Sequence, residues 1–74
     1  MNRPNASVIV YLKQPEHNRD ISQNIASLNG VRKTRISERA NSMICVDYDP
    51  RTTDSRHILQ SVTSQGIDAR LVGM

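Results

Sequence analysis

The chain has 74 residues, a formal net charge of +3 and a single cysteine, Cys45. A chain this short forms at most one domain, so we expect residues 1–74 to be a single domain. One cysteine excludes an intramolecular disulfide and a zinc site built from several cysteines. Trp and Phe are absent, so the core must be aliphatic.

The N-terminal residues contain no apolar signal-peptide core. The longest apolar run, Val8 to Leu12, is far shorter than the roughly 20 residues that a membrane span needs. We therefore expect a cytoplasmic chain, or a cytoplasmic segment of a longer protein, that makes no membrane contact of its own.

The first predicted element is a strand over residues 8–12, which are β-branched, aliphatic or aromatic. Both faces of this strand are apolar, which favours a central position in a sheet. Pro15 lacks a backbone donor and ends the strand region.

A helix is predicted next, from residue 17 or 18 to residue 28. Its apolar side chains recur at i, i+4 and i+7, which places them on one helical stripe: Ile21, Ile25 and Leu28. Ser22 falls on the side that we expect to face water. Gly30 suits the left-handed conformation in which many helices end.

The second and third strands are predicted over residues 31–37 and 43–48. Alternation in the third strand assigns its side chains to two faces. One face carries Ile44, Val46 and Tyr48, and the other carries Met43, Cys45 and Asp47. The excess positive charge gathers along and just after the second strand, at Arg32, Lys33, Arg35 and Arg39.

A second helix follows, with Thr53 as its predicted N-cap and Gly66 just after its end. Its predicted buried stripe consists of Ile58, Leu59 and Val62. The last strand is predicted over residues 67–72.

The element order is therefore β-α-β-β-α-β, which predicts a ferredoxin-like α/β sandwich. In this fold class a four-stranded antiparallel sheet carries two helices on one face and leaves the other face open. Met43, Cys45 and one half of the residue 8–12 strand should lie on the open face. An apolar open face indicates a docking surface, or ordinary exposed apolar area.

The sequence resembles the heavy-metal-associated domain, the module of copper chaperones and of metal-transporting ATPases. The matching segments are Ile25-Ala26-Ser27-Leu28-Asn29-Gly30-Val31, Val46-Asp47-Tyr48-Asp49-Pro50, and residues 58–71 from Ile58 through Gly66-Ile67-Asp68-Ala69-Arg70-Leu71. Their order and spacing cover nearly the whole chain.

The resemblance lacks the motif that binds metal in this family. The family uses two cysteines at C-x-x-C between the first strand and the first helix, and those positions fall at about Gln14 and His17. Cu(I) prefers soft sulfur ligands, so the Cu(I) chemistry of the family is not expected here. Cys45 lies in the third strand and cannot replace the missing pair.

His17 and the adjacent Glu16 could instead bind a borderline divalent metal such as Zn, Ni or Co, with further ligands from a partner. The alternative is a solvated His at a helix start, because two ligands fall short of the three or four in a protein zinc site. His57 is expected to be a surface residue away from His17. Cys45 is either a reactive thiol or a small apolar side chain in the strand.

Lys13, Arg32, Lys33 and Arg35 are the candidate docking residues for an acidic protein surface. The resemblance implies a metal-transporting ATPase, or a neighbouring domain of the same chain, as that partner. The alternative is an edge strand kept soluble by its charge.

No catalytic triad spacing or glycine-rich phosphate loop is visible, so we do not expect an enzyme. Nucleic-acid binding by this fold needs aromatic residues on the open face, where only Tyr11 could serve, so we expect no nucleic-acid partner. The predicted function is a non-catalytic docking module of a metal transport or homeostasis system. The alternative is a small regulatory or oligomerisation domain of the amino-acid-sensing kind.

Overall fold

Strands and helices follow one another in the predicted order. The computed structural model describes residues 4–72. The elements are β1 (Ala6–Leu12), the short 3-10 helix η1 (Pro15–His17), α1 (Asn18–Ala26), β2 (Val31–Ile36), β3 (Met43–Tyr48), α2 (Ser55–Thr63) and β4 (Ala69–Val72).

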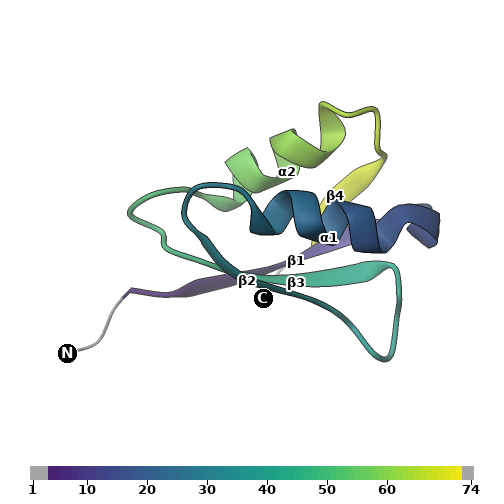
Figure 1. The fold of residues 1–74 in the computed structure, drawn as a ribbon, viewed down its shortest axis with the longest axis horizontal. Helices are drawn as coiled ribbons and strands as arrows, with labels where there is room; N and C mark the ends of the chain where they lie inside the picture. Colours follow the sequence, from purple (N-terminus) through teal and green to yellow (C-terminus); the bar gives the residue numbers. More distant parts are fainter. Residues whose placement is uncertain (1–3, 73–74) are drawn as a thin grey trace.

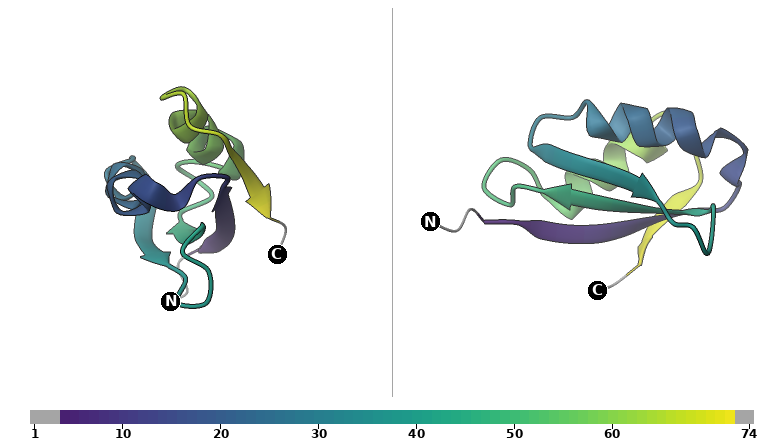
Figure 2. Two further views of the ribbon diagram at one scale, coloured as in Figure 1. Left: turned by 90° about the vertical axis from the view of Figure 1, so that its right-hand side faces the viewer. Right: turned by 60° about the horizontal axis from the view of Figure 1, so that its bottom comes forward.

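The four strands form one sheet in the order β2-β3-β1-β4, and each neighbouring pair is antiparallel. β1 and β3 are therefore central, as the apolar character of β1 predicted. Both helices cover the same face of the sheet, and no helix within residues 4–72 lies on the opposite face (Figure 1, Figure 2). The predicted ferredoxin-like fold class is confirmed.

The core lies between the sheet and the two helices, and it is aliphatic, as the composition required. The alternating residues of β1 and β3 meet the apolar stripes of α1 and α2 there. The buried residues are Val8, Val10, Leu12, Ile21, Ile25, Ile44, Val46, Ile58 and Val62. Leu28 and Tyr48 are partly buried and pack against this cluster.

Several predicted boundaries were wrong. The N-cap of α2 is Asp54 and not Thr53, because the Asp54 carboxylate accepts a hydrogen bond from the His57 backbone N–H at 2.7 Å. β4 begins at Ala69 rather than at residue 67, because its pairing with β1 starts at Leu12↔Ala69. α1 ends at Ala26, two residues before the predicted end.

Ser22 was wrongly predicted to face water. It is buried, and its hydroxyl donates to the Thr34 hydroxyl at 2.9 Å. The Thr34 hydroxyl in turn contacts the Ser22 carbonyl oxygen at 3.3 Å. This pair links α1 to the edge strand β2, so a polar contact fixes the helix over that strand.

Gly30 and Gly66 have φ angles of 95° and 81°, so each follows its helix in the left-handed region, as predicted for Gly30. The Gly30 carbonyl accepts the Asp49 backbone N–H at 2.8 Å, which joins the α1–β2 turn to the end of β3. Among residues 4–72, no helix is long and apolar enough to cross a lipid bilayer.

Candidate metal and docking sites

The connection between β1 and α1 contains the predicted metal ligands. Pro15 occupies the start of η1, and His17 is the last residue of this turn before α1 begins at Asn18. The side chains of Glu16 and His17 are exposed. The Asn18 side chain donates to the Asn41 carbonyl at 2.8 Å and ties the start of α1 to the β2–β3 loop.

A hollow of about 500 Å³ opens beside this turn, between the start of α1 and the loop before β4. Glu16 and His17 line it together with Asp20 and Asp68. Even so, residues 4–72 contain no group of three or more His, Cys, Asp or Glu side chains placed to hold one metal ion. The structure thus brings Glu16 and His17 to one turn without completing a coordination sphere.

Cys45 lies in the middle of β3, on the face of the sheet opposite the helices. It is half-buried, and its neighbours across the strands are Ile9 in β1 and Arg35 in β2. No thiol therefore stands in the β1–α1 connection, so the residues there do not match a two-thiolate Cu(I) site. His57 lies in α2, and the hollow beside His17 does not include it.

The four predicted docking residues separate into three places. Lys33 and Arg35 are exposed in β2 and pair with Asp47 and Cys45, which assigns them to the open face. Lys13 follows the far end of β1, where its ammonium lies 3.7 Å from the Asp68 carboxylate. Both of those side chains are largely exposed, so this ion pair contributes little to stability.

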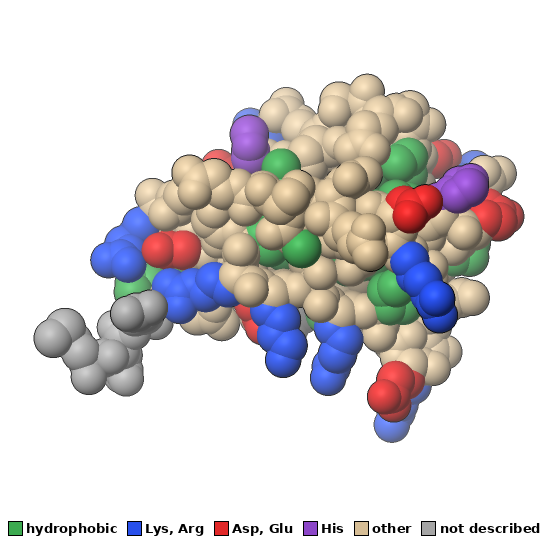
Figure 3. All heavy atoms as spheres, viewed as in Figure 1, with side chains coloured by type: hydrophobic (Ala, Val, Ile, Leu, Met, Phe, Trp, Pro, Cys, Tyr) green, Lys and Arg blue, Asp and Glu red, His purple; other side chains and the backbone are tan. Residues whose placement is uncertain are grey.

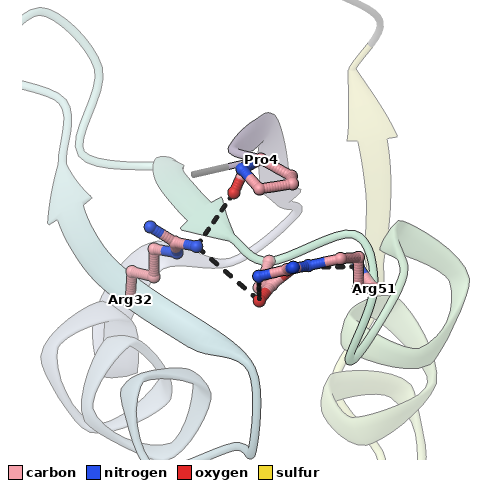
Figure 4. A network of polar contacts seen from close by, with 4 residues as sticks. Pro4, Arg32 and Arg51 are labelled. Carbon is pink, nitrogen blue, oxygen red and sulfur yellow. Dashed lines mark hydrogen bonds and ion pairs between the residues drawn. The ribbon is translucent and has the colours of Figure 1, made fainter. Parts of the chain in front are cut away.

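Arg32 has a different environment from Lys33 and Arg35. The β2–β3 register shifts between Val31 and Lys33, so Arg32 occupies a bulge. Its guanidinium lies 3.6 Å from the Asp49 carboxylate and donates to the Pro4 carbonyl at 2.9 Å (Figure 4). Arg32 thus contacts the residues around it rather than standing free beside Lys33 and Arg35.

Asp49 is the centre of this cluster, which the sequence analysis did not identify. The carboxylate accepts hydrogen bonds from the Arg51 backbone N–H at 2.9 Å and from its guanidinium at 3.3 Å. Chiefly because of the Arg51 side-chain hydrogen bond, the pKa of Asp49 lies below its ordinary value. An Asp-Pro pair that opens a turn, with Arg at the next position, was the available signal.

Comparisons with solved structures define the class of fold. Oxidised MerP from Ralstonia metallidurans CH34 superposes with a TM-score of 0.81 at 12% identity, over 93% of this chain and 99% of that one. A structure described under crosstalk between Cu(I) and Zn(II) homeostasis superposes with a TM-score of 0.76 at 20% identity, over 90% of this chain and 99% of that one. Copper-S46V CopA from Bacillus subtilis gives 0.73 at 17% identity, over the full length of both chains.

No family model and no curated protein matches the sequence. At these identities the superpositions establish the fold. These structures are domains of the heavy-metal-associated type, so the resemblance drawn from the sequence is confirmed as a likeness of fold over nearly the whole chain.

Proposed function

We propose that this chain is a non-catalytic docking module of a metal transport or homeostasis system, without a thiolate Cu(I) site. The observation that carries the proposal is its superposition on the copper-bearing CopA and on a structure of Cu(I) and Zn(II) homeostasis, over at least 90% of the chain. Gln14 and His17 occupy the positions at which we place the two family cysteines.

The proposed partner is an acidic protein surface, on a metal-transporting ATPase or on a neighbouring domain of the same chain. The net charge of +3 supports this choice, because it favours encounter with acidic surfaces. The proposed compartment is the cytoplasm.

Metal binding by the isolated domain should be weak. Glu16 and His17 offer at most two ligands, whereas protein zinc sites use three or four. A Zn, Ni or Co ion held there would take its remaining ligands from the partner. Cu(I) should not bind stoichiometrically, because soft sulfur ligands are absent from this turn.

NMR spectroscopy of the 15N-labelled chain, titrated separately with Cu(I), Zn²⁺, Ni²⁺ and Co²⁺, tests the metal part. We expect small, non-saturating shifts at residues 13–19 with the divalent ions, and the variant His17→Gln should lose them. The matched control His57→Gln should keep them. Saturation by one equivalent of Cu(I) would contradict the proposal. If no metal shifts any amide, the metal-binding part fails and only the docking role remains.

Light scattering coupled to size-exclusion chromatography separates this function from the regulatory alternative. A docking module should elute as a monomer whose mass does not change when free amino acids are added. A dimer that forms or dissociates with an amino acid would favour the regulatory domain instead.

A further inference from the structure

The face of the sheet opposite the helices carries a continuous apolar strip. Ile9 of β1 lies between Cys45 of β3 and Val72 of β4, and Tyr11 lies between Met43 of β3 and Arg70 of β4. Neighbours in register across strands have their Cβ atoms about 4.5–5.5 Å apart, so these side chains lie next to one another on one face. The apolar members are all half-buried although no element of residues 4–72 covers them.

Cations border this strip on two sides. Lys33 and Arg35 of β2 are exposed beside Asp47 and Cys45, and Arg70 of β4 stacks over the Tyr11 ring at 5.1 Å. Lys and Arg side chains project from this side of the sheet in the space-filling view (Figure 3). The carboxylate of Asp47 accepts the Ser7 hydroxyl at 2.6 Å.

The charges and the single aromatic ring of this face argue against two possible partners, a second copy of the chain and single-stranded nucleic acid. If two copies met through it, Lys33, Arg35 and Arg70 of one would face the same cations of the other, and like charges in an interface are costly. Single-stranded nucleic acid binds such faces by stacking bases on several rings. The strand residues of this face that the structure describes offer one ring, Tyr11, and Arg70 already lies against it.

We infer that the open sheet face, with Ile9 and Cys45 at its centre, Tyr11 and Met43 at one end and Lys33 and Arg35 along its edge, is the docking surface for an acidic protein segment. The segment should present apolar side chains to the strip and carboxylates to the cations. This inference rests on the docking role proposed above but not on metal binding, because the β1–α1 turn is a separate part of the chain. Lys13 and Arg32 lie outside this surface.

A selection of random-sequence peptides displayed on phage tests the inference. Peptides that bind the wild-type chain should be rich in Asp and Glu and should also contain apolar residues. One enriched peptide, made synthetically, is then titrated into the 15N-labelled wild-type chain. The amide signals that shift should belong to β1, β2 and β3, and the amide signals of α1 and α2 should not shift.

Charge reversal supplies the matched comparison. The double variant Lys33→Glu/Arg35→Glu should weaken the peptide about tenfold or more, because carboxylates would then face carboxylates. Arg19→Glu/Arg56→Glu makes the same change of charge on the exposed sides of α1 and α2 and should bind as the wild type does. Far-UV circular dichroism and the NMR spectrum establish that both variants fold.

Other outcomes would overturn the inference. These are failure to enrich any peptide, enrichment of basic or uncharged peptides, or shifts confined to the helices. A concentration-dependent dimer whose contacts map to β1 and β3 would identify a second copy as the occupant. Saturable binding of oligo(dT) at the same amides, tighter than the peptide, would identify nucleic acid. The metal titration at residues 13–19 is read separately, so failure of one proposal is distinguishable from failure of the other.

Discussion

Replacing Gly30 with alanine should destabilise the domain far more than the same change at Gly66. Both glycines have positive φ, 95° and 81°, so an alanine at either place meets a similar backbone penalty. That penalty is about 1–2 kcal/mol, because a Cβ in the left-handed region crowds the following carbonyl. If only the backbone conformation mattered, the two substitutions would lower the free energy of unfolding by similar amounts.

The surroundings of the new methyl group differ sharply. A Cβ at Gly30 would lie 2.9 Å from the methyl carbons of both Thr52 and Thr53. At Gly66, apart from the adjoining residues of the chain, no atom of the part that the structure describes lies within 4 Å. The two threonines cannot easily retreat, since both of their backbone N–H groups donate to the Asp49 carbonyl, at 3.0 and 3.1 Å. Overpacking of this kind adds about 1–3 kcal/mol.

The expected loss is thus about 2–5 kcal/mol for Gly30→Ala and about 1–2 kcal/mol for Gly66→Ala. Urea unfolding followed by far-UV circular dichroism measures both, because the chain has no Trp for fluorescence. The urea dependence should stay unchanged if both variants remain two-state. Each kcal/mol corresponds to a fall of about 4–8 °C in Tm for a domain of this size. Equal losses at the two positions would refute the steric part of the reasoning.

Four further predictions concern the polar contacts and the missing cysteine motif. Asp49 has a lowered pKa when folded, so its contribution to stability is present above its ordinary pKa of 3.8 and is lost as the pH falls through the folded value. The stability difference between wild type and Asp49→Asn should therefore be largest near neutral pH and shrink in acid, as measured by urea midpoints. Asp54→Ala should cost about 1 kcal/mol in thermal unfolding because it removes the N-cap of α2. Thr53→Val should be neutral or stabilising by up to about 1 kcal/mol, since the buried Thr53 hydroxyl has no hydrogen-bond partner within residues 4–72. Gln14→Cys/His17→Cys should gain stoichiometric Cu(I) binding in competition with a chromogenic chelator, because it supplies two thiolates.

Each of these predictions has a result that contradicts it. A difference between wild type and Asp49→Asn that persists unchanged into acid would show that the carboxylate charge is not what stabilises the cluster. If Thr53→Val lowers the stability more than Asp54→Ala does, then Thr53 and not Asp54 is the N-cap of α2. For the engineered pair, Gln14→Ser/His17→Ser is the control, and equal Cu(I) uptake by both would assign the metal to Cys45.

The fold was predictable because apolar periodicity identifies each element, and the order of the elements restricts how they can pack. The stripe at Ile21 and Ile25 and the alternation at Ile44 and Val46 each bury one face, and the structure buries those four residues together. The errors arose where a tertiary contact decided the outcome. Ser22 looks like a surface residue in the sequence, and only the approach of Thr34 from β2 gives its hydroxyl a buried partner.

The candidate sites were less predictable than the fold. Spacing placed His17 and Glu16 in the β1–α1 connection, which is a local property of the chain. The separation of Arg32 from Lys33 and Arg35 depends on a bulge and on Asp49, which is distant in sequence. No periodic pattern reveals such a bulge. From the sequence alone, Arg32 therefore looks equivalent to Lys33 and Arg35, although its surroundings differ from theirs.

The two tyrosines report on opposite sides of the sheet. Tyr48 packs against the buried cluster, while Tyr11 lies on the open face beneath the Arg70 guanidinium. Because Trp is absent, their ultraviolet absorbance and emission are not masked by a stronger chromophore. An occupant of the open face would alter the Tyr11 signal and leave Tyr48 alone, whereas loosening of the core would alter Tyr48. Each of the variants Tyr11→Leu and Tyr48→Leu would keep one tyrosine, so the absorbance and emission of the chain would then come from a single known position.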